Sequence, residues 1–385
     1  MARLFVFGFD LGEASQIRRI RCLTSLGHDV RIAAFRRGNM TAQAELGESV
    51  IDLGPVENNR LVKRMIRLVV ALGRVVRRGG GLQGADAIIA RNFDLLLLAW
   101  AVRLIYRQQA TPLVYECLDI HGSFTRRDLV GRVMRWSERR LLARIDLLIV
   151  SSPGFVDHYF RPLQKYRGAV GLIENKLWFD GPKVPRPMTA RVPRPDRPLT
   201  LGWVGSIRCA PSLRILTETA KIMGDRLAIR IHGNVHRHAL PDFDERIAGL
   251  ANVSYAGEYA YPNDLAYIYC GCDLVWAQDL WQRGANSDWL LPNRIYEASW
   301  FGCPSVALAD TETGRRIVEA GLGFVIDSPD APALIRMLES LDHDRIGSVS
   351  TEILNRDERE FRLLPEDVND ALRSVVPPPG VMQGS

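Results

Sequence analysis

Two series of short apolar segments, separated by helical patterns, dominate this sequence. The first series comprises residues 3–9, 28–35, 87–90, 112–119, 147–152 and 169–175. The second comprises residues 199–205, 227–233, 252–257, 273–277, 304–308 and 324–327. Between them, apolar residues recur at helical spacing, as at Ile17, Ile20 and Leu23. Short buried strands that alternate with helices predict an α/β fold, in which helices cover both faces of parallel sheets.

A proline-rich segment separates the two series. Six of the eighteen residues from 181 to 198 are proline, a density that excludes a helix or a central strand. The charge changes sign there: residues 1–180 hold 28 Lys and Arg against 17 Asp and Glu, and residues 181–385 hold 22 against 27. We predict two doubly wound domains, 1–180 and 199–350, joined by a linker at 181–198. A helix and tail at 351–385 would follow. In one arrangement, this helix and tail would pack on the first domain.

Composition excludes several classes of protein. Hydrophobic residues make up 47% and charged residues 24%, as in globular proteins rather than disordered chains. The six cysteines lack C-x-x-C and zinc-finger spacing, which predicts buried reduced thiols. The longest apolar run, 95–102, is too short for a membrane span, and the first ten residues are typical of a strand rather than a signal peptide. The Arg clusters lack the aromatic-rich strand pair or helix-turn-helix pattern of nucleic-acid-binding domains, so we expect no nucleic acid partner. The predicted reduced thiols indicate a cytoplasmic location.

Two glycine turns in the second series are candidate ligand-binding segments. Ligands of parallel α/β sheets bind beyond the carboxyl ends of strands, near helix N-termini. Gly205 and Ser206 follow a predicted strand, and Arg208 offers a cation for a phosphate. His232 and Gly233 follow the next strand. The alternative for the Gly205 segment is a tight turn followed by a surface arginine. The alternative for His232 is a histidine that only packs in the core or the turn.

A long loop and a helix start complete the second-series candidates. The loop within 277–293 carries Asp279, Trp281 and Trp289, which would contact a polar ring or simply pack at the surface. In LPNRIYEASWFGCP, Asn293 and Arg294 open a helix, and Glu297 follows at i+3. A cation at a helix N-terminus is unfavourable unless an anion such as a diphosphate neutralises it. Glu297 would accept hydrogen bonds from ribose hydroxyls, or the two charges would form an intrahelical salt bridge.

These segments resemble those of a known enzyme family. LPNRIYEASWFGCPSVA is similar to the nucleotide-sugar motif of family-4-type glycosyltransferases, and LTSLGHDVRIAAF, IIARN, LVYECLDIHG, LLIVSSPGF and LIENK also resemble that family. The resemblance covers most of residues 1–345. It implies a GT-B fold, in which two Rossmann-like domains face each other across a cleft. The second domain would bind a nucleotide-diphospho-sugar, UDP- or GDP-linked, and the first would bind the acceptor.

The resemblance also assigns roles to individual positions. Gly205, Ser206 and Arg208 would face the diphosphate. Arg294 stands where the family has lysine and would pair with a phosphate, and Glu297 would bind the ribose. No Asp-x-Asp pair lies near this motif, so we expect a metal-independent enzyme without a cofactor.

Two departures from the family pattern leave inversion and retention of the anomeric configuration open. Many retaining members carry a further Glu with seven residues between it and the ribose-binding Glu, a position that Trp289 occupies here. The glycine pair that many members have after the first strand is reduced to Gly12. An inverting reaction would need a general base in the first domain.

Three residues of the first series are candidates for that base. Asp119 ends a predicted strand and aligns with the catalytic Asp of some inverting relatives that build bacterial exopolysaccharides; alternatively it caps the segment that follows. His121 lies two residues further on, and Glu13 lies in the loop after the first strand. Glu116 is the lesser candidate because it lies inside the strand.

Residues 58–78 form a basic amphipathic helical pattern. Leu61, Met65, Leu68, Val69, Leu72, Val75 and Val76 fall on one side of a helical wheel, opposite Lys63, Arg64, Arg67, Arg74, Arg77 and Arg78. Within this family the pattern suggests docking on an anionic membrane surface, extended by residues 126–144; the alternative is an ordinary helix with a solvated basic face.

We therefore interpret the chain as a glycosyltransferase of bacterial cell-surface polysaccharide synthesis, for lipopolysaccharide or exopolysaccharide. It would act on a saccharide or lipid-linked acceptor at the inner face of the cytoplasmic membrane. Two alternatives remain at this point: a nucleotide-sugar epimerase of the same architecture, and a catalytically silent module that binds a carbohydrate or a partner protein.

Overall fold

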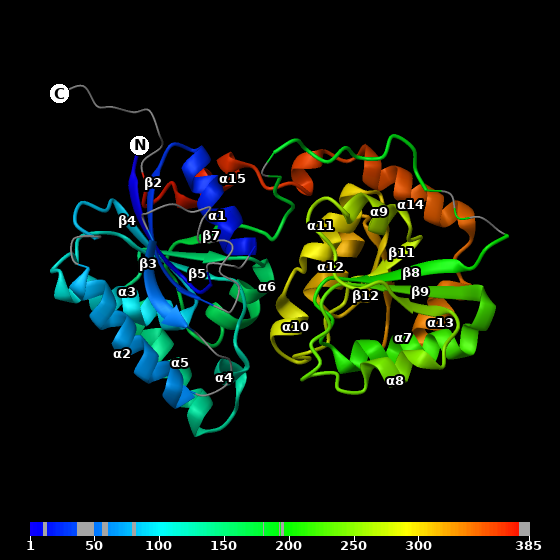
Figure 1. Cartoon of the computed structure of the whole chain (residues 1–385), viewed down its shortest axis with the longest axis horizontal. Helices are drawn as coiled ribbons and strands as arrows, with labels where there is room; N and C mark the ends of the chain where they lie inside the picture. The colour runs from blue at the N-terminus through cyan, green and yellow to red at the C-terminus, as the bar shows by residue number, and fades with distance from the viewer. Residues whose placement is uncertain are drawn as a thin grey trace. The chain divides into compact units, whose positions relative to one another are not determined.

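The computed structural model describes residues 1–10, 14–36, 50–55, 61–78, 82–179, 181–191, 193 and 196–376. The chain forms two compact units (Figure 1). Unit 1 comprises Met1–Glu174 and Leu364–Ser385, and unit 2 comprises Asn175–Leu363. The chain therefore passes between the units twice.

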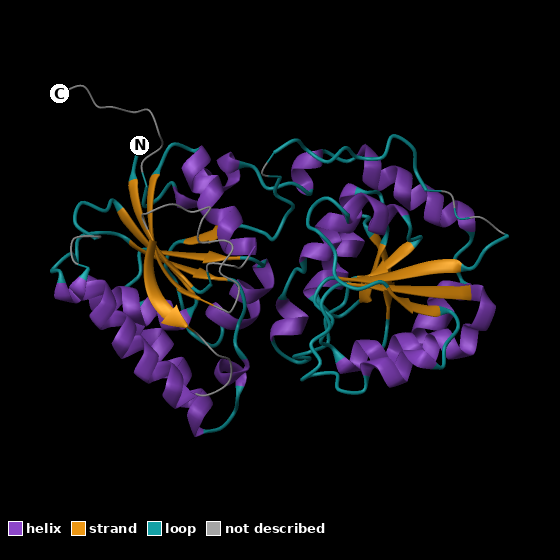
Figure 2. Ribbon diagram, in the orientation of Figure 1, coloured by secondary structure: helices purple, strands orange, loops and turns teal. Residues whose placement is uncertain are grey.

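A sheet of parallel strands forms the centre of unit 1 (Figure 2). It has seven strands, in the order β3-β2-β1-β4-β5-β6-β7. Their bounds are β1 (Arg3–Gly8), β2 (Asp29–Arg36), β3 (Val50–Pro55), β4 (Ala87–Arg91), β5 (Leu113–Cys117), β6 (Leu147–Val150) and β7 (Val170–Leu172). Every residue of β4, β5 and β6 is buried, as expected for the central strands of a parallel sheet. The sequence analysis missed β3, because Asp52 and Gly54 interrupt its short apolar run.

Helices cover both faces of this sheet. Their bounds are α1 (Ala14–Ser25), α2 (Leu61–Arg77), α3 (Phe93–Ile105), α4 (Gly122–Thr125), α5 (Leu129–Leu142), α6 (Pro153–Phe155) and α15 (Pro365–Leu372). A layer of α2, α3 and α5 packs on one face, and α1 packs with α15 on the other (Figure 1). The Asp128 carboxylate caps α5 by accepting a hydrogen bond from the Gly131 N–H at 3.0 Å.

The α2 helix differs from the predicted wheel in what it buries. Leu68 and Val75 are buried as expected, whereas Val69 and Val76, assigned to the same side, are 68% and 37% exposed. The side chains of residues 61–65 lie outside the described part of the helix. The physical reason for the difference is that α2 rests on β3 and α3 through a narrow stripe, which leaves a second apolar stripe facing outward.

Six parallel strands form the sheet of unit 2, in the order β10-β9-β8-β11-β12-β13. Their bounds are β8 (Leu199–Val204), β9 (Leu227–His232), β10 (Val253–Tyr255), β11 (Leu274–Trp276), β12 (Ser305–Leu308) and β13 (Gly323–Ile326). The helices are α7 (Ala210–Met223), α8 (Phe243–Ala248), α9 (Leu265–Cys270), α10 (Asn286–Trp289), α11 (Asn293–Trp300), α12 (Glu312–Glu319), α13 (Ala331–Glu339) and α14 (His343–Asn355). The predicted α/β class with two doubly wound parallel sheets is confirmed.

The proline-rich segment 181–198 lies within unit 2, so the division between the units falls earlier, at Glu174 and Asn175. Two arginines of this segment, Arg186 and Arg191, hold it on the unit. Each donates hydrogen bonds to three main-chain carbonyl groups: Trp300, Ile353 and Arg356 for the first, and Tyr269, Phe301 and Gly302 for the second. The segment is therefore bound to a domain rather than linking two.

The C-terminal part of the chain is divided between the units. The α14 helix belongs to unit 2, and after Leu363 the chain returns to unit 1, where α15 packs against α1 and β7. The predicted tail segment of 351–385 therefore splits at residue 363. All six cysteines are free; five are buried and Cys270 is exposed.

Both sheets reverse strand order at one point. In unit 1 the chain leaves β1 toward β2 and later returns to β4 on its other side, and in unit 2 the same happens at β8 between β9 and β11. Helices on opposite faces leave a crevice beyond the carboxyl ends of such strands, where α/β proteins bind ligands. The residues that follow β8, β9 and β11 are therefore expected to form a ligand site.

Candidate functional site

Two glycine turns bring the carboxyl ends of β8 and β9 together. Gly205 and Gly233 follow these strands with φ angles of 106° and 130°, values that favour glycine. The Gly205 N–H donates to the carbonyl oxygen of His232 at 2.9 Å. A methyl group on Gly233 would lie 1.8 Å from the carbonyl oxygen of Gly205, so only glycine fits at this position. The predicted turn residues therefore lie side by side.

Arg294 reaches this pair of turns from the start of α11. The helix begins at Asn293, as predicted, and no side chain caps its N-terminus. Nη2 of Arg294 lies 3.9 Å from where a methyl group on Gly205 would be, and Nη1 donates to the carbonyl oxygen of Trp276 at 3.4 Å. No carboxylate among the described residues lies within ion-pair distance of Arg294. An unpaired cation beside an uncapped helix N-terminus favours an anion.

Glu297 lies one turn later on α11 and is only 6% exposed. Its Oε2 accepts a hydrogen bond from the hydroxyl of Tyr269 at 2.7 Å. Burial, and then the charge of Glu297, raise the pKa of Tyr269 well above its ordinary value, so the phenol remains a donor. A carboxylate at this position can accept hydrogen bonds from ligand hydroxyls.

Arg208 already has a carboxylate partner. Its Nη2 lies 3.5 Å from Oδ2 of Asp279, the predicted loop residue after β11. Oδ1 of Asp279 accepts from the Trp281 N–H at 2.7 Å and from the Ser287 hydroxyl at 2.9 Å. Of the two arginines expected at a diphosphate, Arg294 is thus the one with an open charge within the described structure.

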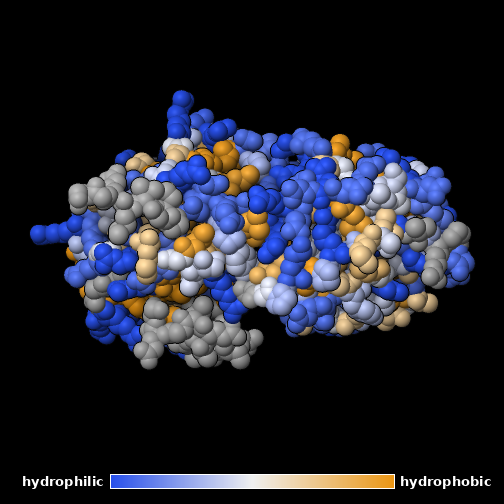
Figure 3. All heavy atoms as spheres, turned by 90° about the horizontal axis from the view of Figure 1, so that it is seen from above, coloured by the Kyte–Doolittle hydropathy of each residue, from blue (hydrophilic) through white to orange (hydrophobic). Residues whose placement is uncertain are grey.

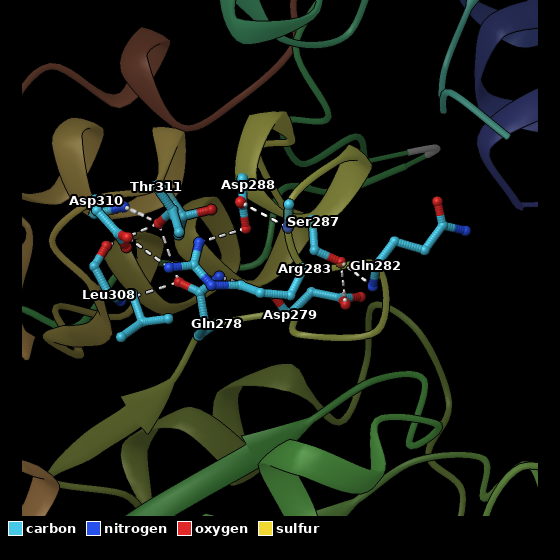
Figure 4. Close-up of polar contacts among 12 residues, drawn as sticks. Gln278, Asp279, Gln282, Arg283, Ser287, Asp288, Leu308, Asp310 and Thr311 are labelled. Carbon is cyan, nitrogen blue, oxygen red and sulfur yellow. Dashed lines mark hydrogen bonds and ion pairs between the residues drawn. The ribbon is translucent and has the colours of Figure 1, made fainter. Parts of the chain in front are cut away.

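A polar network fixes the rest of the loop after β11 (Figure 4). Arg283 bridges Asp288 and Asp310, with N–O distances of 2.6 and 2.5 Å. Gln278 Oε1 accepts from the Leu308 N–H and from the Thr311 hydroxyl, at 3.0 and 3.1 Å. The network holds the loop around α10, which ends at the half-buried Trp289. Trp281, by contrast, is 43% exposed.

Ser206 and His232 complete the turns. The Ser206 hydroxyl oxygen lies 2.8 Å from Nε2 of His236, a residue that the sequence analysis did not single out. His232 ends β9 and is 8% exposed. Burial, and then Arg230, lower the pKa of His232, which favours a neutral ring at neutral pH. The contact of His232 to the Gly205 turn is made by its main-chain carbonyl.

In unit 1, Asp119 lies in an exposed bend two residues after the end of β5. The main chain of the bend is held from two sides. The Ser151 hydroxyl donates to the carbonyl oxygen of Leu118 at 2.9 Å, and the Cys117 thiol contacts the carbonyl oxygen of Asp119 at 3.6 Å. An accessible carboxylate on a fixed main chain at a strand end is suited to proton abstraction.

His121, rather than Asp119, caps the helix that follows. Its Nδ1 accepts from the Ser123 N–H at 3.2 Å and lies 2.9 Å from the Ser123 hydroxyl. Because Nδ1 serves as an acceptor, the neutral ring carries its proton on Nε2. His121 is thus the N-cap residue of α4, and Asp119 does not have the N-cap role considered from the sequence.

Glu116 is 1% exposed, inside an ion-pair cluster. Its Oε1 lies 2.8 Å from Arg19 and its Oε2 lies 3.1 Å from Arg91. Burial opposes ionisation, but the two arginines outweigh it and hold the pKa of Glu116 below its ordinary value. A buried carboxylate locked between two guanidinium groups is a poor proton acceptor. Glu13 lies outside the described residues.

Sequence reasoning missed two side chains that contact the predicted site, Tyr269 and His236. Tyr269 lies 28 positions before Glu297 in another helix, so no local spacing links the two. His236 belongs to the run HRH after the second glycine turn, and this cluster of imidazoles near a basic residue was the available signal.

Comparison with known proteins extends these observations to the chain as a whole. Residues 18–173 match the model of the glycosyl transferase 4-like domain. The succinoglycan biosynthesis protein ExoL of Rhizobium meliloti (strain 1021) is 36% identical over 343 residues, which cover 89% of this chain and 85% of ExoL. The chain belongs to the glycosyl transferase 4-like family. It is a glycosyltransferase, and the resemblance seen in the sequence is confirmed.

Solved structures show the fold of this glycosyltransferase to be GT-B. HepE of Anabaena, in complex with UDP and glucose, is 15% identical with a TM-score of 0.69, and the match covers 97% of this chain and 100% of HepE. Sucrose-phosphate synthase from Thermosynechococcus elongatus is 13% identical with a TM-score of 0.71, over 97% of this chain and 98% of that one. These TM-scores over nearly the whole of each chain establish the shared architecture of two parallel-sheet units.

Proposed function

We propose that this glycosyltransferase moves a sugar from a UDP-sugar to a hydroxyl group of a saccharide or lipid-linked acceptor, in the synthesis of a bacterial cell-surface polysaccharide. The observation that carries the proposal is the unpaired Arg294 guanidinium beside the Gly205 turn, at the strand-order switch of unit 2. UDP bound to HepE and the role of ExoL in succinoglycan synthesis support the donor and the pathway class.

In this proposal unit 2 holds the donor. Main-chain N–H groups at the start of α11 bind the diphosphate beside the Gly205 turn, and Arg294 neutralises it as the leaving group develops charge. Glu297, fixed by Tyr269, accepts hydrogen bonds from the ribose hydroxyls. These groups supply the charge stabilisation, so the proposed reaction requires no metal ion.

Unit 1 would provide the acceptor site and the base. If the reaction inverts the anomeric configuration, Asp119 removes the proton from the acceptor hydroxyl as the oxygen attacks the anomeric carbon. The exposure of Asp119, and the engagement of His121 and Glu116 in other bonds, support this choice.

Two helices of unit 1 expose apolar stripes that support membrane docking. On α2 the exposed set is Ile66, Val69, Val70 and Val76. On α5, Leu129, Val133 and Trp136 are 65%, 51% and 56% exposed, at i, i+4 and i+7. The Arg140 guanidinium lies 5.3 Å from the centre of a Trp136 ring. A tryptophan flanked by arginines is typical of residues at a membrane interface.

The stripes differ from the isolated apolar residues found on any protein surface. On the face drawn in Figure 3, apolar residues form small groups between hydrophilic areas. On α2 and α5 they recur at helical spacing beside Arg67, Arg77, Arg132 and Arg139. None of the helices in the described ranges is long and apolar enough to cross a bilayer. We propose that the enzyme docks peripherally on the anionic inner face of the cytoplasmic membrane through these two helices.

The test incubates the protein with radiolabelled UDP-sugars, with and without a bacterial membrane extract. Transfer of label to lipid only in the presence of extract supports the proposal. Conversion of the sugar nucleotide without extract would indicate an epimerase, and binding of UDP-sugar without any turnover would indicate a catalytically silent module. Either of the last two results contradicts the proposed function.

A further inference from the structure

Ser206 and His236 form a hydrogen-bonded pair at the edge of the Gly205 turn. The distance from Ser206 Oγ to His236 Nε2 is 2.8 Å. Main-chain bonds fix the two loops that carry them, because the Ile207 N–H donates to Asn234 and the His236 N–H donates to Ile207, each at 2.9 Å. The pair is therefore set by the backbone of both turns and not by side-chain contact alone.

The groups around His236 are mostly cationic. Arg208 and His238 face it, and the His236 and His238 ring centres lie 5.6 Å apart. Carboxylates of the neighbouring segments have partners of their own: Asp279 pairs with Arg208, Asp244 pairs with Arg237, and Glu258 accepts a hydrogen bond from the side-chain amide of Asn234. Burial, then Arg208, then His238 lower the pKa of His236, so the ring is neutral near neutral pH when no anion is bound.

The direction of the hydrogen bond between His236 and Ser206 depends on the protonation state of His236. In the neutral ring, Nε2 either accepts from the hydroxyl or, in the other tautomer, donates to it. In the imidazolium, Nε2–H must donate to Ser206 Oγ, and the hydroxyl proton is then directed elsewhere. Protonation thus converts Ser206 into a hydrogen-bond donor for whatever lies beyond the turn, and an anion is the species that would favour this state.

We propose that His236 is a positioning residue of the diphosphate site: when the donor binds, His236 takes a proton from solvent, and the imidazolium holds Ser206 so that its hydroxyl donates to a phosphate oxygen. This inference rests on the proposed function, which places the donor diphosphate at the Gly205 turn. The serine keeps its own proton, and the imidazolium returns the extra one to solvent when the nucleotide leaves.

The proposal makes donor affinity depend on pH. A bound diphosphate raises the pKa of His236 relative to the free protein, so binding takes up a proton and is tighter at lower pH. UDP-glucose is the suitable probe, because its diphosphate is esterified at both ends and does not titrate near neutral pH. The expected gain in affinity between about pH 8 and about pH 6 is roughly threefold to tenfold.

Calorimetry with UDP-glucose tests this in the wild type and in His236→Gln and His238→Gln variants. In buffers of different ionisation enthalpy, the wild type and His238→Gln should take up a proton on binding, and His236→Gln should not. Ser206→Ala and His236→Gln should each weaken binding at about pH 6 by a similar factor, and their combination should cost little more, because they remove one coupled unit.

The results distinguish failure of the proposed donor site from failure of the inference about His236. If wild-type protein fails to bind UDP-glucose, the donor assignment falls and this inference falls with it. If the wild type binds and Arg294→Ala weakens binding, but the proton uptake persists in His236→Gln, the donor site stands and the inference about His236 is wrong. Additive losses in the Ser206 and His236 variants would also overturn it.

Discussion

The guanidinium of Arg294 lies against the Gly205 turn, without a carboxylate partner among the described residues. Replacement with alanine should therefore remove a charge-assisted contact to the diphosphate. We expect Arg294→Ala to weaken UDP binding at least tenfold, about 1.4 kcal/mol, in a calorimetric titration. Arg214→Ala changes an exposed arginine on α7 and is the matched control. Equal affinity of Arg294→Ala and the control would refute the diphosphate contact.

Asp119 permits a test that separates chemistry from donor binding. Asp119→Asn keeps the size of the side chain and removes its basicity, so turnover should fall by about 10²-fold or more. Unit 2 is unchanged, so UDP affinity should be that of the wild type. The measurement is the rate of label transfer alongside the calorimetric affinity. Full activity in Asp119→Asn would mean that the base lies elsewhere or that the enzyme retains configuration.

For single residues, the sequence predicts the place in the fold better than it predicts which side chains are in contact. The glycine turns and the start of α11 follow from strand and helix patterns, and the structure brings Gly205, Gly233 and Arg294 together. Their role in donor binding stays a prediction. The bond from Tyr269 to Glu297 was not predictable, because it joins two helices that only tertiary packing brings together. For the same reason, the sequence left open whether Arg294 and Glu297 form a salt bridge.

Among the elements, α5 contains a buried carboxyl group with consequences for stability. Glu138 accepts hydrogen bonds from Tyr115 on β5, from Tyr159 and from Gln164. Burial raises the pKa of Glu138 to about 7, against the opposing effect of these bonds. The folded protein therefore holds a proton that the unfolded chain has released, and stability falls as pH rises through this window.

Glu138→Gln should abolish that dependence. Between about pH 5 and about pH 8 the wild type should lose up to about 3 kcal/mol of stability that the glutamine variant keeps. The measurement is the unfolding midpoint of both proteins in urea at each pH. Parallel pH profiles would show that Glu138 is ionised in the folded state.

The apolar stripes of α2 and α5 predict a second property of elements. Combining Val69→Asp with Trp136→Ala should reduce binding to vesicles that contain anionic lipid by about tenfold, because apolar burial and an interfacial anchor are lost. Ile222→Ala, which alters a residue 61% exposed on α7 of unit 2, is the control. Sedimentation with vesicles provides the measurement. Unchanged sedimentation of the double variant would exclude these helices as the docking surface.

Element boundaries show where pattern reading ends. The apolar runs located the six strands of unit 2. They did not reveal β3 in unit 1, because polar and glycine residues interrupt its apolar pattern. The end of β5 falls two residues before Asp119, which moves this residue from the strand into an accessible bend. Prolines in 181–198 predicted a linker between domains; hydrogen bonds from Arg186 and Arg191 instead hold the segment on unit 2.

For the whole molecule, the two series of strands predicted two parallel-sheet units, and the family comparison confirms a GT-B glycosyltransferase. The sequence left packing of the tail on the first domain as one arrangement. It did not locate the crossing back to unit 1 after Leu363, because no pattern in the short α15 identifies the surface on which this helix packs. The charge difference between residues 1–180 and 181–385 fits the proposal that the first unit binds the acceptor and the second binds the donor.

The central claim is that unit 2 binds the diphosphate of a UDP-sugar between the Gly205 turn and the start of α11. A crystal structure of the protein soaked with UDP tests this most directly. We expect diphosphate density within hydrogen-bond distance of Arg294 and of the Gly205 turn, with ribose hydroxyls at Glu297. Nucleotide density at another place in unit 2, or with Arg294 and Glu297 out of contact with it, would contradict the account.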